Sequence, residues 1–462
     1  MILLYHPMYS KAEINSDSNY VIMRSLIPKI LEKNKDWHFI IPFPSKDTDF
    51  KYVNDGFFSH PNIIRVPYRI SVRKKCNAIS FDSYFYEKLF RIYAFDVVFN
   101  NLVEISHHMK HLMDTYENLG CPIVISSHHY VYHESLPYVM ESMENIVISQ
   151  LLGSILCDVN IVNSKYTDWM LMDNIGKYFN KDQSNRVKRE IIPLGIIDKA
   201  FFKNLSNNKK ENEIPIIGYN HRLQAYKNYI DTFELLEEIY AEGIKFKLIY
   251  FNQNNDNCKR INELKFPTEY CRTDNYNDYI NNLARCDLNV TNSQYETFCI
   301  AGVESMALGQ ALLAPNIMTF PEITPVNYPY LFDGWNDQKE KLKILLQSKE
   351  LLKKAGQDCQ KFVFDNFTDE IYAKNIISLI NRLNESVMGE LSLKDTSKDQ
   401  IIELVKKMPN KISLQDAKNW FYSKTTCFSN QSLPLPKLKR LMNLLGYHDD
   451  LVGMDQWFTK LT

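Results

Sequence analysis

Short apolar runs alternate with amphipathic segments along most of the 462-residue chain. In the first half, the apolar runs that we expect to be strands cover residues 1–6, 38–42, 63–66, 95–100, 122–127 and 159–163. In the second half they cover residues 215–219, 245–251, 287–291 and 311–314. Helical spacing predicts helices between many of these runs, at 19–32, 228–241, 276–284 and 300–308. This alternation is typical of parallel sheets with helical crossovers.

The alternation pauses at residues 191–195 and resumes after the polar stretch 204–213, which indicates a domain boundary. We therefore expect an α/β fold with two Rossmann-like, doubly wound domains. The expected parts are an amino-terminal domain over 1–195, a second domain over 196–388 whose last helices can cross back, and a small helical appendage over 389–462. Ligands of such domains bind at the carboxyl ends of the strands.

Composition excludes several classes of protein. The apolar content of 45% excludes a disordered chain. The formal charge of −1 means that any phosphate binding must be local. Nine scattered cysteines without CxxC spacing favour a reducing compartment over a zinc site or a disulfide framework. The apolar start at residues 1–6 lacks a basic region, and the longest apolar stretch, 146–162, is too short and polar to span a bilayer. We expect a cytoplasmic protein.

The most informative segment runs from Ser293 to Pro315. Glu296 follows a predicted buried strand, and Glu304 lies one to two turns into the next predicted helix. A helix N-terminus offers amide groups to a phosphate, and a carboxylate one turn deeper accepts hydrogen bonds from a ribose diol. Glu296 would then meet a sugar. The alternative is that Glu296 caps the helix and Glu304 is solvated, and for such a pair alone both interpretations stay open.

This arrangement resembles the signature of retaining nucleotide-sugar glycosyltransferases with the two-domain GT-B fold. Three other segments fall in the order of that family, at residues 158–164, 192–196 and 217–228. The resemblance covers about residues 1–385. It implies a nucleoside-diphosphate sugar, linked to UDP or GDP, as donor substrate, with no metal and no other cofactor required.

The resemblance also implies roles for single residues. Arg222 and Lys227 match the cationic clamp that stabilises the charge of the departing diphosphate. Glu304 matches the residue that holds the ribose, and the neighbouring donor-binding positions are Phe298, Cys299 and Ile300. The chain departs from the family at Thr297 and Cys299, where glycines are preferred. Side chains there narrow the approach of the backbone to the donor phosphates.

A histidine-rich segment follows the predicted strand that starts at Pro122. The family often has a histidine at the end of this strand, close to the donor sugar, and the spacing favours His128. His128 and Glu296 are therefore the catalytic candidates. His129 and His133 are weaker candidates for contact with the acceptor. For each histidine, a structural or surface role is the alternative.

The acceptor is suggested by a closer resemblance. The runs 218–228, 295–296 and 314–325 are similar to queuosine-tRNA mannosyltransferases and to phage enzymes that glycosylate hydroxymethylated pyrimidines in DNA. Both imply a nucleic-acid base as acceptor. Residues 391–462 carry eleven Lys and Arg against seven Asp and Glu, which would anchor a phosphate backbone. The basic candidates for acceptor binding are Arg73, Lys74, Lys437, Lys439 and Arg440, although each spot alone also fits a solvated face.

We therefore expect a retaining glycosyltransferase that moves a sugar to a hydroxyl on a modified base, with hydroxymethylated pyrimidine in phage DNA preferred over tRNA. One alternative is an acceptor that is tRNA, a polysaccharide or a protein. Another is a non-catalytic nucleic-acid binder that keeps the fold. A remoter one is an epimerase or phosphorylase-like enzyme. The sequence determines neither the sugar nor the oligomeric state.

Overall fold

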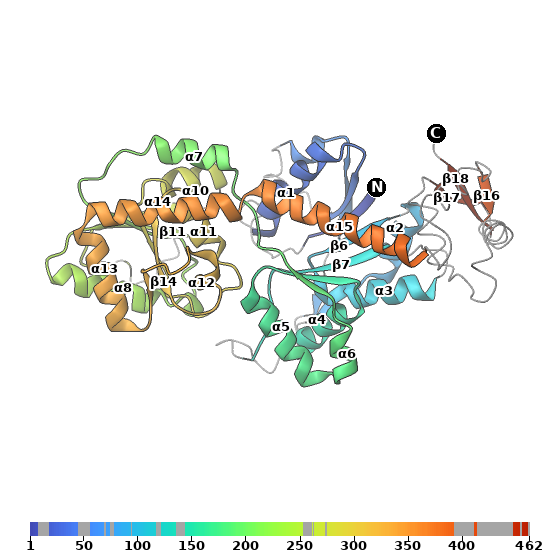
Figure 1. Ribbon diagram of the computed structural model, residues 1–462, viewed down its shortest axis with the longest axis horizontal. Coiled ribbons are helices and arrows are strands. Elements are labelled where there is room, and N and C mark those ends of the chain that lie inside the picture. The colour runs from blue at the N-terminus through green and yellow to red at the C-terminus, as the bar shows by residue number, and fades with distance from the viewer. Residues whose placement is uncertain are drawn as a thin grey trace.

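The computed structural model shows two α/β domains side by side, with a small sheet near the carboxyl terminus (Figure 1). It describes residues 1–7, 18–44, 56–68, 71–73, 78–93, 95–116, 122–134, 144–252, 261, 263–272, 275–391, 411–413, 447–452 and 455–460.

The amino-terminal sheet has seven strands in the order β3-β2-β1-β6-β7-β8-β9, and all of its pairings are parallel. The strands are β1 (Ile2–His6), β2 (His38–Pro44), β3 (Ile63–Tyr68), β6 (Val97–Asn100), β7 (Ile123–His128), β8 (Val159–Val162) and β9 (Arg189–Ile191). The helices of this half are α1 (Ser18–Lys33), α2 (Ser83–Ile92), α3 (Ser106–Thr115), α4 (Glu144–Leu156), α5 (Lys165–Tyr178) and α6 (Lys181–Asn185). A short hairpin joins β4 (Ser71–Arg73) to β5 (Ala78–Ser80).

The second sheet has six parallel strands in the order β12-β11-β10-β13-β14-β15. They are β10 (Ile216–Tyr219), β11 (Lys247–Asn252), β12 (Thr268–Arg272), β13 (Leu288–Val290), β14 (Ala311–Pro315) and β15 (Leu331–Phe332). The helices are α7 (Lys199–Asn207), α8 (Tyr229–Ala241), α10 (Tyr276–Leu283), α11 (Ile300–Ala307), α12 (Phe320–Ile323), α13 (Trp335–Gln347) and α14 (Lys349–Asn366). All ten strands expected from apolar runs are present.

The central strands are apolar because both of their faces are covered. Every residue of β7 and of β14 is buried. Parallel strands between two layers of helices lose water on both faces, so continuous apolar runs mark them. β9, β12 and β15 were not predicted, because edge strands of two to five residues keep polar or half-exposed positions.

The helix α15 (Asp369–Leu391) leaves the second domain and packs along α1 of the first (Figure 1). Its start is fixed to the segment that links the two sheets, where the Asp369 amide donates to the Ile197 carbonyl at 3.2 Å. Gly195 allows this close approach, since a Cβ atom there would lie 2.2 Å from the carbonyl oxygen of Thr368. The chain therefore passes between the domains twice.

In the appendage over 389–462, the residues described beyond α15 form strands. β16 (Lys411–Ser413), β18 (Asp455–Lys460) and β17 (Tyr447–Val452) make an antiparallel sheet in that order. This corrects the helical prediction for these segments. Only Gly453 and Met454 separate the last two strands in the sequence, and such a short connection is a hairpin signal.

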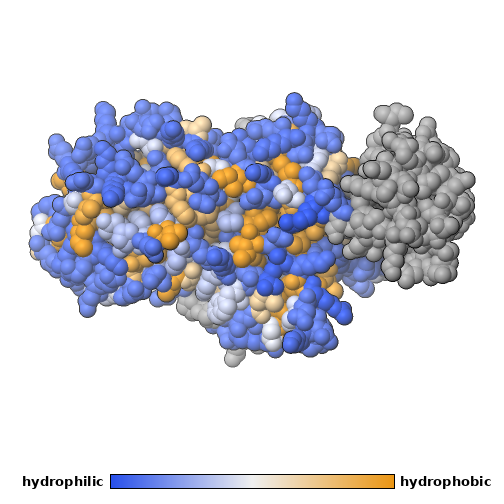
Figure 2. Space-filling model, viewed as in Figure 1, coloured by the Kyte–Doolittle hydropathy of each residue, from blue (hydrophilic) through white to orange (hydrophobic). Residues whose placement is uncertain are grey.

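The surface is mainly hydrophilic on the face shown in Figure 2, and hydrophobic residues gather over the amino-terminal domain around the crossing helix. None of the helices in the described ranges is long and apolar enough to cross a membrane.

Candidate active site

The loop that follows β13 touches the amino-terminal domain just beyond the ends of β7 and β8. The Thr297 hydroxyl donates to the carbonyl oxygen of His129 at 2.9 Å. In return, the Ser164 hydroxyl donates to the Thr297 carbonyl at 2.8 Å. The Tyr295 hydroxyl donates to the Val131 carbonyl at 3.0 Å. The carboxyl ends of strands from both sheets therefore meet at this loop.

A second contact between the domains lies at the start of α5. The Glu322 carboxylate, on α12, accepts hydrogen bonds from the backbone amides of Lys165 at 2.7 Å and Tyr166 at 2.9 Å. The first amides of a helix lack partners within the helix, and the helix dipole favours negative charge there. Glu322 thus caps a helix of the opposite domain. The N-cap residue of the same helix is Ser164, whose side chain accepts a hydrogen bond from the Thr167 amide.

A buried ion pair lies beside the loop. The Lys227 ammonium is 2.5 Å from Oε1 of Glu296, and each side chain is only 12% exposed. Lys227 ends the short 3₁₀ helix Ala225–Lys227, which follows β10. Burial, the largest single effect, opposes the charge on Lys227, but Glu296, Tyr226 and Cys299 together outweigh it and the pKa of Lys227 is raised. The Lys227 ammonium is consequently held in its charged form with little access to bulk water.

His221 and Cys299 border this pair. Nδ1 of His221 lies 3.8 Å from the Glu296 carboxylate, and burial, followed by the charge of Lys227, lowers the pKa of His221 well below its usual value. Within the described part of the chain, His221, Glu296 and Cys299 place potential metal-ligand atoms within 4.8 Å of one another. Burial raises the pKa of the Cys299 thiol, and the Glu296 charge adds to this effect. A protonated thiol and a carboxylate paired with Lys227 disfavour a metal ion here.

The two residues that stand in place of glycines have different surroundings. Thr297 turns its hydroxyl towards the amino-terminal domain, so it holds the two domains together. Cys299 has a φ of 58° at the N-cap of α11, a left-handed conformation that glycine adopts at less cost. Phe298 is buried against Phe367, with ring centroids 5.3 Å apart, and Ile300 begins α11.

Glu304 is buried on α11 at 4% exposure, which rules out the solvated alternative for it. The Tyr276 hydroxyl donates to its Oε1 at 2.9 Å, and the Tyr279 hydroxyl donates to its Oε2 at 2.7 Å. Burial raises the pKa of Glu304 to about 7, although both tyrosines act in the opposite direction. The two tyrosines, from α10, were not predicted to lie here. Arg222, in contrast with Lys227, has an exposed side chain.

The neighbouring histidines His128 and His129 have different surroundings in the structure. Nε2 of His128 lies 2.9 Å from Oδ1 of Asn160 and 3.3 Å from the Ser154 hydroxyl, so its ring is held inside the amino-terminal domain. His129 donates to Oδ1 of Asn101 at 2.7 Å, and its carbonyl receives the Thr297 hydroxyl. Burial lowers the pKa of each to about 4, which leaves both rings neutral at pH 7. His129 is thus the histidine beside the loop.

His133 belongs to an aromatic cluster at the start of α5. Its Nε2 lies 2.7 Å from Oδ2 of Asp173, and its ring centroid lies 5.1 Å from that of Trp169. The Trp169 ring stacks on Tyr166 at 5.7 Å and is 51% exposed. Sequence reasoning missed this exposed tryptophan, because a single aromatic on a helix does not signal its exposure.

Only one of the five basic acceptor candidates lies among the described residues. The backbone of Arg73 lies in β4. The other four fall outside the described residues: Lys74, Lys437, Lys439 and Arg440.

Residues 198–380 match the family model described as glycosyl transferases group 1. Three solved structures share the whole two-domain fold. A glycosyltransferase from Rickettsia africae has a TM-score of 0.59 and 16% identity, covering 82% of this chain and 98% of that one. Anabaena HepE in complex with UDP-glucose has a TM-score of 0.60 and 13% identity, covering 83% and 100%. Sucrose-phosphate synthase from Thermosynechococcus elongatus has a TM-score of 0.61 and 12% identity, covering 83% and 99%.

None of the curated protein sequences matches the chain. The structural likeness extends over both sheets, so the expected fold, two Rossmann-like domains of the GT-B type, is confirmed. The match to the family model covers the second domain and the start of α15, which contain Lys227, Glu296 and Glu304.

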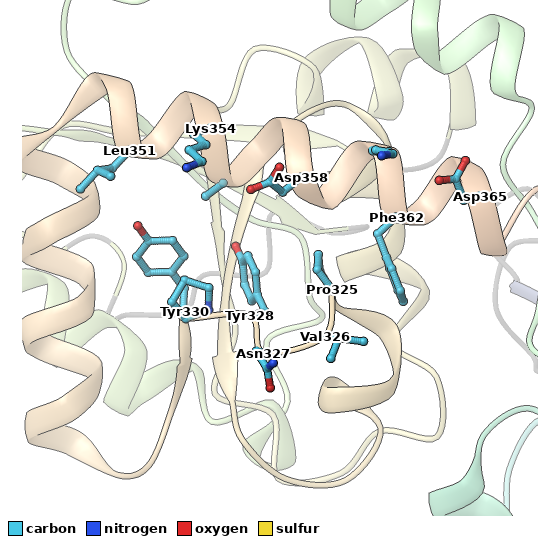
Figure 3. Close-up of a pocket in the computed structure, with 13 residues that line it drawn as sticks. Pro325, Val326, Asn327, Tyr328, Tyr330, Leu351, Lys354, Asp358, Phe362 and Asp365 are labelled. Carbon is cyan, nitrogen blue, oxygen red and sulfur yellow. The ribbon is translucent and has the colours of Figure 1, made fainter.

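A separate hollow of about 530 Å³ lies on the second domain, between the loop 325–330 and α14 (Figure 3). Tyr328 and Tyr330 border it from the loop, and Phe362 borders it from α14. The Tyr328 hydroxyl accepts a hydrogen bond from the amide of Leu312 in β14, which makes this side chain part of the core. The predicted site residues do not line this hollow.

Proposed function

We propose that this protein is a retaining glycosyltransferase that transfers a sugar from a nucleoside diphosphate to a hydroxyl group on a modified nucleic-acid base. The observation that carries the proposal is the buried pair of Lys227 and Glu296, which lies beside α11 where the two domains touch. The match of residues 198–380 to glycosyl transferases group 1 supports it.

The donor diphosphate would bind between Lys227 and the start of α11. The Cys299 side chain makes no capping hydrogen bond at this helix N-terminus, and the first backbone amides of α11 would donate to the phosphate oxygens. Negative charge develops on the diphosphate as it leaves, and a cation fixed in a site with little water stabilises that charge. Arg222, on the exposed side, would close on the diphosphate when it binds. Since HepE is described in complex with UDP-glucose, UDP-sugars are the first donors to test.

Glu296 and a neutral histidine would hold the sugar. The contacts around the loop favour His129 over His128 for this role, because His128 is bound to Asn160 and Ser154. The acceptor hydroxyl would attack from the face that the diphosphate leaves, and the leaving phosphate would take its proton. This course retains the anomeric configuration.

A base as acceptor is supported by the stacked pair of Trp169 and Tyr166. The exposed Trp169 ring lies close to the seam between the domains, since the Tyr166 amide is bound by Glu322. Aromatic rings stack on bases of any sequence, and each such contact contributes about 1–3 kcal/mol. The basic composition of residues 391–462 would add phosphate contacts.

Turnover would test the proposal directly. The protein is incubated with hydroxymethylated DNA, unmodified DNA, tRNA or a small glycan, across a panel of UDP- and GDP-sugars. The nucleic acids are digested to nucleosides for mass analysis, and the anomeric configuration of the product is read by NMR. We expect a glycosylated nucleoside from hydroxymethylated DNA. A product on tRNA or on the glycan would reassign the acceptor, and binding of nucleic acid without any turnover or donor hydrolysis would favour a non-catalytic protein.

Variants at single residues test the separate parts of the proposal. His129→Gln is expected to reduce turnover more than His128→Gln, provided that both proteins keep the thermal stability of the wild type. Arg222→Ala and Glu304→Ala test the donor site, and full activity in both would contradict it. Trp169→Ala should raise KM for nucleic acid, whereas Tyr178→Ala, which removes an exposed aromatic from the same helix, serves as the matched control.

A further inference from the structure

The two tyrosines on Glu304 differ in how firmly the fold holds them. The Tyr279 hydroxyl also accepts a hydrogen bond from the Asn220 side chain at 2.9 Å. Asn220 in turn donates to the Ala301 carbonyl at 2.9 Å. Asn220 also donates to the Ser305 hydroxyl at 3.2 Å and accepts a hydrogen bond from Asn289 at 2.9 Å, so Tyr279, which is only 8% exposed, belongs to a hydrogen-bonded network within the second domain. Tyr279 is therefore a fixed part of the second domain.

Tyr276 is held less tightly by its own domain. It is the first residue of α10, and its side chain is only partly buried. The guanidinium carbon of Arg24, on α1 of the opposite domain, lies 5.8 Å from the centroid of its ring. A cation over an aromatic face attracts the ring whether or not the hydroxyl is engaged. The ring can hence keep its contact with Arg24 while its hydroxyl leaves Glu304.

A hollow of about 470 Å³ opens beside these residues. Arg24, Pro28 and Phe57 line it from the amino-terminal domain, and Asn277 lines it from the second. Its walls combine an apolar floor with a guanidinium and an amide, and such groups bind the ring and the polar edge of a nucleobase. Asn277 directly follows Tyr276 in the chain, so the hollow lies beside the tyrosine that contacts Glu304.

We infer that the Tyr276 hydroxyl competes with a ribose hydroxyl of the donor for Glu304, and that the nucleobase enters the hollow beside Arg24. The inference rests on the proposed function and specifies how that site selects its nucleotide. Tyr276 sets how tightly any ribonucleotide binds, because each must displace its hydroxyl. Arg24 sets which base is preferred, and it does so from the domain opposite to the diphosphate.

Calorimetric titration with UDP, GDP, ADP and 2′,3′-dideoxy-UDP tests the competition. Tyr276→Phe keeps the ring and removes the competing hydroxyl, so it should bind UDP roughly threefold to tenfold more tightly than the wild type. The gain should vanish with the dideoxy nucleotide, which has no hydroxyl to take the freed oxygen. Tyr279→Phe is the matched control and should bind UDP no more tightly than the wild type.

Several outcomes would overturn the inference. Unchanged or weaker UDP binding by Tyr276→Phe means that the hydroxyl supports Glu304 rather than competing for it. An equal gain with the dideoxy nucleotide excludes the ribose as the competitor. Arg24→Met should change the ratio of affinities for UDP, GDP and ADP, and an unchanged ratio removes the hollow as the base site. If the wild type binds none of these nucleotides, the proposed function fails as well, whereas turnover without the Tyr276→Phe gain contradicts this inference alone.

Discussion

The Glu322 carboxylate accepts a hydrogen bond from the backbone amide of Tyr166 at 2.9 Å, although the two residues belong to different domains. Because the adjacent Lys165 amide donates to the same carboxylate, one side chain joins α12 to the first turn of α5. The interaction depends on the closed arrangement of the two sheets. It therefore reports directly on whether the domains are together.

Glu322→Ala is expected to destabilise this closed arrangement. Loss of a helix cap costs about 1 kcal/mol, and here the cap acts between domains, so the domains should separate more often. Hydrogen exchange at the Lys165 and Tyr166 amides should become faster, and the radius of gyration from small-angle scattering should increase. Glu213→Ala, which changes an exposed glutamate, is the control. Unchanged exchange at both amides would contradict the prediction.

Replacement of Lys227 by Met should separate its catalytic and structural contributions. The variant leaves the Glu296 carboxylate buried without its partner, so both thermal stability and turnover should fall, the latter by about 10²- to 10³-fold. In the double variant Lys227→Met with Glu296→Gln, stability should recover because no lone charge remains. Turnover should stay low. Recovery of activity together with stability would mean that the pair is only structural, and Lys203→Met gives the baseline for an exposed lysine.

The raised pKa of Glu304 predicts a pH dependence of stability. Its pKa is about 7 in the folded chain against 4.5 for an ordinary glutamate, so the folded state holds an extra proton between these values. The resulting stabilisation is complete below about pH 4.5 and is lost as the pH rises through about 7, by up to about 3 kcal/mol. Denaturant titrations of the wild type and Glu304→Gln between pH 4.5 and 8 would measure it. As the pH rises, the unfolding free energy of the wild type should fall relative to that of the variant. A difference that does not change with pH would refute the raised pKa of Glu304.

Gly195→Ala tests the passage of the chain between the domains. A Cβ atom at this position would lie 2.2 Å from the Thr368 carbonyl oxygen and 2.4 Å from the Cβ atom of Tyr372, and the backbone cannot yield cheaply. We expect a loss of about 3 kcal/mol in unfolding free energy, or displacement of α15. Gly176→Ala in α5 meets no atom within 4 Å and should be neutral or slightly stabilising. Equal unfolding free energies for the two variants would show that a Cβ atom at position 195 is not crowded by Thr368 and Tyr372.

Much of the fold could be predicted from the sequence, because buried parallel strands leave continuous apolar runs. β7 and β14 are examples in which every residue is buried. Edge elements such as β15, with two residues, carry too little apolar surface to be recognised. The β17–β18 hairpin was missed for a related reason, since Asp449 and Asp450 interrupt the alternation of its first strand.

The candidate site could be predicted in part. Spacing along one loop and helix was enough to single out Glu296 and Glu304, and the segment after β10 led to Lys227. Which of two adjacent histidines lies near the loop could not be read from spacing, because neighbouring side chains leave a strand end in opposite directions. Tyr276 and Arg24 come from distant segments, and only the packing of α10 against α1 brings them together.

The packing of α15 against α1 has a consequence for folding during translation. The helix that completes the packing of the amino-terminal domain is translated only after the whole second sheet. During translation, the amino-terminal domain therefore emerges first but completes its packing last. The apolar face of α1 stays exposed until α15 has been synthesised. The two sheets then mature as one unit, and neither can be excised as a continuous segment that keeps its full core.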